Sequence, residues 1–244
     1  MPDLEGQVAI VSGAARGIGL AIVTELADAG ADLILVDSLP TEAAAAAVTE
    51  RGGTAVQVRV DVTDRPAFRS ALEGAIATRG RVDVLVNNAG VVSTRGFAEL
   101  GDDEWDRVLA VNLTAAFVST QSVWSRMVAQ RHGRLVYIGS RAARTGGNNA
   151  GPAYVASKGG IQALVIAAAK EGAPHGILAN GVAPGPIRTE MTQLASYQDE
   201  SQATPLGRMG RPEEIAAAVR FLCSPAASFL TGTVLNVSGG AVMG

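Results

Sequence analysis

The stretch that decides the fold is VAIVSGAARGIGLAIV, residues 8–23. Four apolar residues come first, then a turn that holds Gly13, Gly17 and Gly19, and then apolar residues at helical spacing. A strand, a glycine turn and a helix in this order bring free backbone N–H groups and the positive end of a helix dipole together. Such a turn suits a pyrophosphate, and the stretch predicts dinucleotide binding. Glycines alone would also fit a purely structural turn.

Short apolar runs recur along the chain, with helix-length segments between most of them. The runs cover residues 8–11, 33–36, 55–60, 82–86, 135–138, 178–182 and 234–237. Strands that are apolar on both faces are typical of a parallel sheet covered by helices on each side. We therefore predict an α/β fold: a doubly wound Rossmann sheet of seven parallel strands, in one dinucleotide-binding and catalytic domain over residues 1–244.

Composition and charge argue against several classes of partner. The 20 basic and 23 acidic residues are scattered, and the net charge of -3 leaves no basic stripe for nucleic acid. With one cysteine, Cys223, and two histidines, neither an intramolecular disulfide nor a zinc site is expected. We expect Cys223 to be a small core residue.

No membrane segment or export signal is expected from the sequence. The longest apolar helical stretch, residues 161–169, is shorter than the roughly 18 to 20 residues that span a bilayer. Asp3 and Glu5 stand where a secretory leader would carry basic residues. A cytoplasmic protein without a membrane partner is the resulting expectation.

Asp37 ends the second predicted strand, at the spacing where an acidic residue meets the adenosine ribose. A carboxylate accepts hydrogen bonds from the ribose 2′- and 3′-hydroxyls and repels an additional 2′-phosphate. Asp37 therefore favours NAD over NADP as the cofactor. Arg16 argues the other way, because a guanidinium there could pair with that phosphate.

The glycine spacing and four further motifs resemble the short-chain dehydrogenase/reductase family over the whole chain. The further motifs are Asp61-Val62, Asn87-Asn88-Ala89-Gly90, Tyr154-Val155-Ala156-Ser157-Lys158 and Pro184-Gly185. Residues 208–214 and 236–240 are also similar to the 3-oxoacyl-(acyl-carrier-protein) reductase-like branch. Ser12 departs from the threonine that is usual at its position, which keeps the hydroxyl and loses a methyl group.

The resemblance implies a set of cofactor contacts and no metal. The implied dinucleotide-binding residues are Gly13, Arg16, Gly17, Ile18, Gly19, Asp37, Asp61, Val62, Asn88, Gly90, Tyr154, Lys158, Ile187 and Thr189. In this set, Asp61 and Val62 contact the adenine ring, and Asn88 and Gly90 line the adenosine and ribose path. Ile187 and Thr189 contact the nicotinamide carboxamide.

Tyr154 and Lys158 are the central catalytic candidates. On a helix they lie one turn apart on one face, where the ammonium can stabilise a phenolate that in free tyrosine forms only near pH 10. The resemblance implies that Tyr154 exchanges a proton with the carbonyl oxygen while hydride moves directly to or from the nicotinamide. It also implies that Ser140 orients the substrate oxygen and that Asn112 holds a water that relays protons through Lys158.

Other charged residues are expected to be structural. Asp102, Asp103 and Glu104 precede a helix containing Trp105, and carboxylates in a first helical turn ordinarily complement the helix dipole. His132 and His175 flank predicted strands, and we expect both to be loop residues rather than catalysts.

The substrate pocket is expected from residues 91–97 and 141–151 and from a lid over residues 186–205, because these segments follow strand ends. Their composition is mixed. Residues suited to an apolar chain are Met191, Leu194 and Tyr197, and residues suited to hydroxyls are Asn148, Asn149 and Gln193.

We therefore expect an NAD-linked dehydrogenase of a small secondary alcohol, polyol or hydroxyacyl compound. The alternative is an NADPH-dependent 3-oxoacyl thioester reductase. Of the two basic residues with which that branch docks its carrier protein, Arg131 matches one, but His175 replaces the other. A non-enzymatic dinucleotide-binding protein is a third hypothesis, against which the intact set of four catalytic candidates argues.

The resemblance also implies a homotetramer in which the helices of Asn112 and Tyr154 pack against symmetry mates. Small residues on these helices, Ala115, Ala116, Ala163 and Ala167, would allow close packing, but they would equally suit contact with the chain's own sheet.

Overall fold

The computed structural model describes residues 3–147, 149–190 and 204–243. Its strands form one seven-stranded parallel sheet, as predicted, and their order in the sheet is β3-β2-β1-β4-β5-β6-β7. The strands are β1 (Val8–Ser12), β2 (Asp32–Asp37), β3 (Ala55–Arg59), β4 (Val84–Asn87), β5 (Gly133–Ile138), β6 (Ile177–Pro184) and β7 (Val234–Val237). The strand order reverses between β1 and β4, and doubly wound sheets bind ligands at the carboxyl side of this point.

Strand boundaries differ from the predicted ones where a side chain or a neighbouring strand takes over the hydrogen bonds. Residues 82–86 read as a strand, yet β4 begins only at Val84. The Gln130 side chain bonds both the N–H and the C=O of Val82, at 3.1 and 2.7 Å, which removes Val82 from the ladder. β6 continues past the predicted end to Pro184, because β7 pairs with it as far as Pro184 and Val237.

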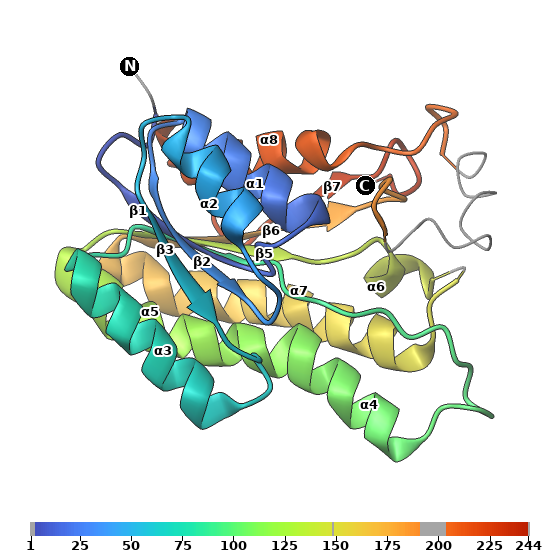
Figure 1. Ribbon diagram of the computed structural model, residues 1–244. Helices are drawn as coiled ribbons and strands as arrows, with labels where there is room; N and C mark the ends of the chain where they lie inside the picture. The colour runs from blue at the N-terminus through green and yellow to red at the C-terminus, as the bar shows by residue number, and fades with distance from the viewer. Residues whose placement is uncertain (1–2, 148, 191–203, 244) are drawn as a thin grey trace.

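Helices cover both faces of the sheet (Figure 1). One face carries α1 (Gly17–Asp28), α2 (Glu42–Thr49) and α8 (Pro212–Cys223). The other face carries α3 (Arg65–Arg79), α5 (Ala115–Gln130) and α7 (Pro152–Gly172), with α4 (Asp102–Leu109) beside α7. A short helix, α6 (Ala142–Thr145), follows β5, and a π-helical turn, Ala110–Thr114, joins α4 to α5.

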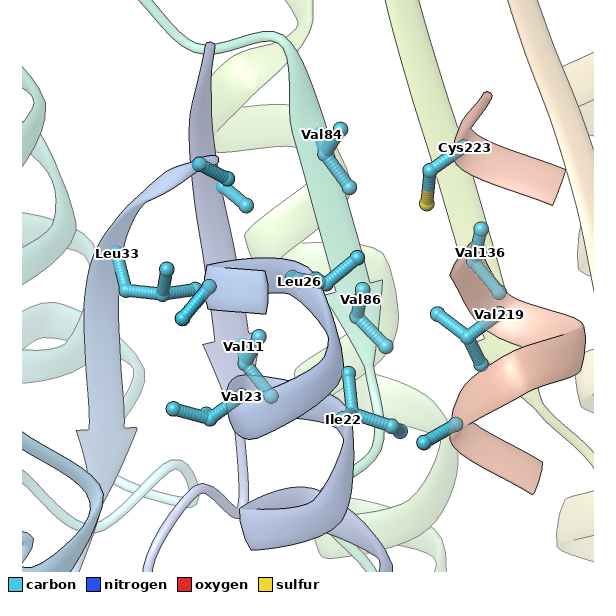
Figure 2. Close-up of a cluster of buried hydrophobic side chains, with 14 of the residues drawn as sticks. Val11, Ile22, Val23, Leu26, Leu33, Val84, Val86, Val136, Val219 and Cys223 are labelled. Atoms are coloured by element: carbon cyan, nitrogen blue, oxygen red, sulfur yellow. The ribbon is translucent and has the colours of Figure 1, made fainter. Parts of the chain in front are cut away.

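A dry aliphatic layer fixes α1 and α8 against the sheet. Ile22, Val23 and Leu26 of α1 follow one helical face and are fully buried against the strands, while Val219 of α8 packs into the same layer (Figure 2). Cys223 lies in this layer as a free, buried thiol, which confirms its predicted core position. The rigid sheet and α1 therefore fix the backbone of the glycine turn between them.

None of the described helices has both the length and the apolar composition that a bilayer-spanning helix needs. In residues 3–147, 149–190 and 204–243, His, Cys, Asp and Glu side chains do not gather in groups of three or more as a metal ion would require.

Candidate functional site

A cleft of about 640 Å³ opens at the carboxyl ends of the strands. Every residue predicted to contact a dinucleotide lines it, from Asp37 and Asp61 at one end to Tyr154 and Lys158 at the other. Ser140 lines it as well, whereas Asn112 lies behind the wall, 2% exposed. The fold thus brings positions that are spread over most of the chain to one hollow.

The glycine turn after β1 depends on the absence of side chains. Gly13 and Gly17 have φ angles of +68° and +57°, in the left-handed region that other residues rarely adopt. A β-carbon at Gly19 would overlap the Gly13 carbonyl oxygen, so the first turn of α1 can pack this closely only as glycine. The turn leaves the N-terminus of α1 open toward the cleft, as a pyrophosphate site requires.

A cross-strand set of hydrogen bonds holds this turn in place. The Ser12 hydroxyl accepts from the main-chain N–H groups of Asn88 and Ala89, at 3.0 and 3.1 Å. The Asn88 side-chain amide donates to the carbonyl oxygens of Ser12 and Gly13, both at 3.0 Å. These contacts need only a hydroxyl at position 12, so serine in place of threonine preserves them.

Asp37 marks one end of the cleft. Its carboxylate accepts a hydrogen bond from the Ala15 N–H at 2.9 Å and another from the Leu39 N–H at 2.9 Å. The first bond ties the acid to the glycine turn. Nearby, Asp61 accepts from the N–H and hydroxyl of Thr63, and these bonds lower the pKa of Asp61.

Lys158 at the other end is a buried cation. It is 4% exposed, its Nζ donates to the Ile138 carbonyl oxygen at 2.8 Å, and it lies 5.8 Å from the centre of the Tyr154 ring. Burial lowers the pKa of Lys158 to about 8. The helical spacing therefore does bring ammonium and phenol together, as predicted from the sequence.

Asn112 lies in the π-helical turn and supports the loop beside Lys158. Its side-chain oxygen accepts from the Val91 N–H at 2.8 Å, and its amide nitrogen donates to the Val91 carbonyl oxygen and to the Ser157 hydroxyl, at 2.9 and 3.0 Å. A β-carbon at Gly90 would lie 3.4 Å from the Asn112 oxygen and 3.6 Å from the Lys158 Nζ. Sequence reasoning missed Ser157, although it stands inside the quoted motif.

Ser140 lies two residues after the end of β5, not within the strand, and lines the same cleft as Tyr154. Its hydroxyl oxygen accepts a hydrogen bond from the Ala142 N–H at 3.1 Å, which orients the side chain at the start of α6. A hydroxyl held in this way keeps its own proton available to donate to a second oxygen.

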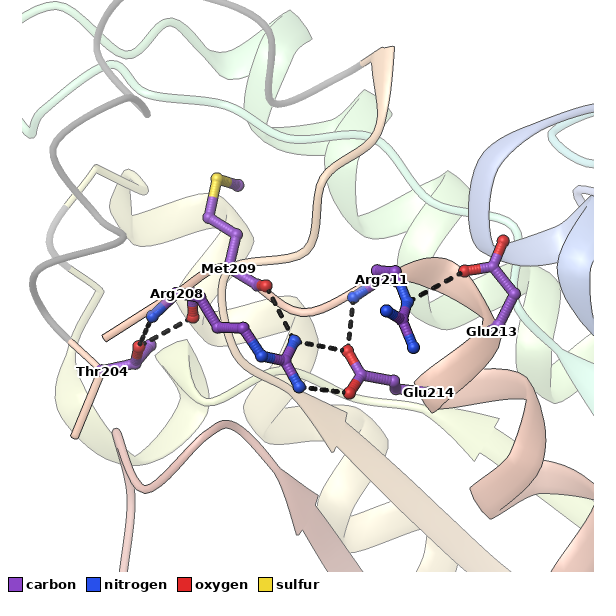
Figure 3. Close-up of polar contacts among 6 residues, drawn as sticks. All are labelled: Thr204, Arg208, Met209, Arg211, Glu213 and Glu214. Atoms are coloured by element: carbon purple, nitrogen blue, oxygen red, sulfur yellow. Dashed lines mark hydrogen bonds and ion pairs between the residues drawn. The ribbon is translucent and has the colours of Figure 1, made fainter. Parts of the chain in front are cut away.

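The segment after β6 is pinned where it leaves the cleft. Arg188 N–H donates to the Gly210 carbonyl oxygen at 2.9 Å, and Gly210 N–H donates to the Pro186 carbonyl oxygen at 2.9 Å. Gly210 belongs to a turn that the Glu214 carboxylate stabilises by accepting from Arg208 and from the Arg211 N–H (Figure 3).

Thr189 and Glu190 follow this held segment and lie over the glycine turn. The Glu190 carboxylate lies 2.8 Å from Arg16 Nη1. Sequence reasoning also missed Glu190. Residues 191–203 of the predicted lid lie outside the described residues, including Met191, Gln193, Leu194 and Tyr197, as does Asn148.

A second hollow of about 780 Å³ adjoins the cleft and shares Asn149 and Ala150 with it. Thr94, Phe97 and Trp105 form part of its wall, so the predicted substrate segments 91–97 and 141–151 contribute to both hollows.

The remaining charged candidates lie outside the cleft. Asp102, Asp103 and Glu104 occupy the first turn of α4, and Glu104 pairs with Arg95 at 3.0 Å. Neither His132 nor His175 lines the cleft. His132 lies in the connection between α5 and β5, as expected, whereas His175 is the last residue of a short 3-10 helix, Ala173–His175, and not a loop residue.

The buried ammonium predicts an unusual pH dependence of stability. Between about pH 8 and 10.5 the unfolded chain holds the Lys158 proton and the folded chain has released it, so wild-type stability rises with pH in this window. Lys158→Met removes this dependence. We expect this variant to be more stable than wild type at pH 7, by up to roughly 3 kcal/mol, with the difference shrinking above pH 8.

Urea unfolding from pH 7 to 10.5 measures the difference. Lys170→Met, at an exposed position of the same helix, is the matched control and should show no such trend. A wild-type to Lys158→Met difference that stays constant across this range would contradict the buried-charge account.

Comparisons with known proteins agree with this geometry. The enoyl-(acyl carrier protein) reductase family model matches residues 13–242. The 3-oxoacyl-[acyl-carrier-protein] reductase FabG of Aquifex aeolicus is 39% identical over 244 residues, 97% of this chain and 98% of that protein. The 2-dehydro-3-deoxy-D-gluconate 5-dehydrogenase of Pseudoalteromonas atlantica is 39% identical over 246 residues, 98% of this chain and 96% of that protein.

Solved structures give the same result. A short-chain type dehydrogenase/reductase from Mycobacterium marinum is 33% identical with a TM-score of 0.95, over 99% of this chain and 98% of that one. Carveol dehydrogenase from Mycobacterium avium, solved with NAD, is 28% identical with a TM-score of 0.94, over 99% of both chains. The cleft, its residues and these likenesses together place the chain in the short-chain dehydrogenase/reductase family of NAD(P)-dependent oxidoreductases that act on CH–OH and keto groups.

Proposed function

We propose that this protein is an NAD(H)-dependent dehydrogenase that interconverts a secondary alcohol and its ketone, in one dinucleotide-binding and catalytic domain over residues 1–244. The substrate class is a small alcohol, a polyol or a hydroxyacyl compound. One observation carries the proposal: a single cleft holds a ribose-binding acid, Asp37, at one end and Tyr154, Lys158 and Ser140 at the other. The residues between these ends would hold a dinucleotide over the glycine turn, with its nicotinamide at the Tyr154 end.

The bound nicotinamide supplies or accepts the hydride. The chain's own residues handle the proton and the orientation of the substrate. Ser140 donates a hydrogen bond to the substrate oxygen, and Tyr154 gives its phenolic proton to that oxygen in reduction and takes it back in oxidation. The charge on Lys158, 5.8 Å from the ring centre, stabilises the phenolate that this exchange leaves behind.

In this proposal, Asn112 acts by holding the Val91 backbone and the Ser157 side chain in place beside Lys158. Both N–H groups of its side-chain amide donate, to Val91 and to Ser157, so a water in a proton relay would donate to an oxygen of Asn112. π-Helical turns such as the one that contains Asn112 are frequent at functional sites.

Asp37 supports NAD as the cofactor. Two main-chain N–H groups fix the carboxylate at the cleft end, so it is held where it can accept from ribose hydroxyls and repel a 2′-phosphate. The NAD named with carveol dehydrogenase agrees with this choice. For the rest of the cofactor, we propose as contacts the other cleft-lining residues that the family resemblance implies.

The runner-up function is an NADPH-dependent 3-oxoacyl thioester reductase, which the FabG relatives favour. Arg131 and His175 stand where that branch would dock a carrier protein. The Arg131 guanidinium bonds the Pro174 carbonyl oxygen at 3.4 Å, which places it beside His175. We expect a surface with one arginine, Arg131, to dock a carrier protein less tightly than a surface with two such basic residues.

A homotetramer is part of the proposal. Phe117 on α5 and Ile166 on α7 are 49% and 60% exposed, on the two helices through which the family resemblance implies packing. Covering such side chains with a second copy would remove apolar surface from water.

A paired titration with NADH and NADPH, followed by a turnover screen with the preferred cofactor, tests the proposal. The screen covers secondary alcohols, polyols and 3-oxoacyl thioesters. We expect tighter NADH binding and turnover of alcohols or polyols. NADPH preference with 3-oxoacyl reduction would replace the proposal with the runner-up, and cofactor binding without any turnover would favour a non-enzymatic role.

Tyr154→Phe is expected to lower kcat by several orders of magnitude while NAD binding stays nearly unchanged, because it removes the one proton-exchanging oxygen at the reacting carbonyl. Tyr137→Phe is the matched control: Tyr137 is buried against Thr120, outside the cleft, and should keep kcat within tenfold of wild type. Substantial turnover by folded Tyr154→Phe would rule out this mechanism.

Asp37→Ala is expected to raise the NADP to NAD ratio of kcat/KM on the order of 10- to 100-fold, the value of a lost charge-assisted hydrogen bond. Asp37→Asn keeps the shape of the side chain and separates loss of charge from loosening of the loop. A ratio unchanged in both variants would mean that the ribose does not bind at Asp37.

A further inference from the structure

An ion pair bridges the two sides of the dinucleotide cleft. Arg16 Nη1 in the glycine turn lies 2.8 Å from the Glu190 carboxylate, which comes from the segment after β6, 174 residues further along the chain. Both residues line the cleft, and their side chains are 62% and 66% exposed. The pair therefore stands at the mouth of the cleft and is reachable from solvent.

The backbone around Glu190 is positioned independently of this pair. Ile187 is buried and bridged to Gly210, and Arg188 bonds Gly210 as well. Thr189 lies over the glycine turn, with its Cγ2 3.6 Å from where a β-carbon of Gly17 would be. Glu190 thus extends from a held segment toward Arg16, and its carboxylate lies beside the guanidinium.

Two carboxylates contact the glycine turn at Arg16 and at the residue before it. The neighbouring residue, Ala15, donates its N–H to Asp37, and the guanidinium itself pairs with Glu190. A cofactor 2′-phosphate brings close to two further negative charges to the Asp37 end. The Glu190 carboxylate already offsets the charge on Arg16 and would repel a phosphate brought to the same guanidinium.

We propose that Glu190 is a positioning residue that sets cofactor preference: it holds Arg16 in an ion pair, away from a 2′-phosphate, and so reinforces the discrimination made by Asp37. The inference rests on the dinucleotide site of the proposed function and adds to it a second determinant. It also explains how an arginine suited to NADP can accompany an aspartate suited to NAD in one cleft.

A double-mutant cycle tests this coupling without any need for a substrate. Dissociation constants of NADPH and NADH are measured by fluorescence titration at low salt for wild type, Glu190→Gln, Arg16→Gln and the double variant. We expect Glu190→Gln to shift the ratio of the two constants toward NADPH by about two- to fivefold, the range for a solvent-exposed ion pair. In the Arg16→Gln background the same change should leave the ratio where it was.

Two further variants make the test specific. Glu190→Asp keeps the charge and should restore most of the wild-type ratio. Glu213→Gln removes an equally exposed carboxylate, paired with Arg211 at 3.9 Å outside the cleft, and should not move the ratio. Raising the salt concentration should shrink the Glu190→Gln effect, because exposed charges are screened.

The outcomes separate this inference from the proposed function. If wild type binds both nucleotides and Glu190→Gln leaves the ratio unchanged, or shifts it equally without Arg16, the inference is wrong and the proposed function stands. An equal shift in Glu213→Gln would also overturn it, because the effect would then be one of net charge. If wild type binds neither nucleotide, both fail.

Discussion

The hydrogen bonds between Ser12 and the Asn88 segment are the constraint on which the site depends. They join the ends of β1 and β4 at the point where the strand order reverses, through one hydroxyl and one side-chain amide. Gly13 and Gly19 contribute no side chains of their own to brace the turn: Gly13 takes a left-handed conformation, and Gly19 packs against the Gly13 carbonyl oxygen. A glycine turn is entropically costly to order, and fixed partners on the neighbouring strand offset that cost.

The catalytic end has a different energetic character. There the fold buries a lysine and gives it one main-chain acceptor, Ile138, and burial depresses its pKa. Such a residue opposes stability at neutral pH, and its retention fits a role beside the Tyr154 phenol. Asn112 and Ser157 show how much supporting structure this arrangement requires. Two side-chain hydrogen bonds from Asn112 fix Val91, next to the Gly90 that approaches both Asn112 and Lys158, and a third joins Asn112 to Ser157.

Local patterns predicted most of the fold. Apolar strands, the glycine turn and the four-residue spacing of Tyr154 and Lys158 are features of short segments, and parallel sheet rules then determine which strand ends meet. Local patterns could not predict which side chains pair between residues that are far apart in the sequence. Nothing near Arg16 points to Glu190, 174 residues away, and nothing near Val82 indicates that Gln130 removes it from β4. The π-helical turn around Asn112 reads as ordinary helix in the sequence, because an inserted residue leaves no local signature.

The central claim is that one dinucleotide spans this cleft, with its adenosine ribose at Asp37 and its nicotinamide at Tyr154. A crystal structure of the protein with NADH bound tests it most directly. The account predicts ribose hydroxyls within hydrogen-bond distance of the Asp37 carboxylate, the pyrophosphate at the N-terminus of α1, and the nicotinamide beside Tyr154 and Lys158. A dinucleotide bound with its nicotinamide away from Tyr154, or with no contact to the glycine turn, would contradict it.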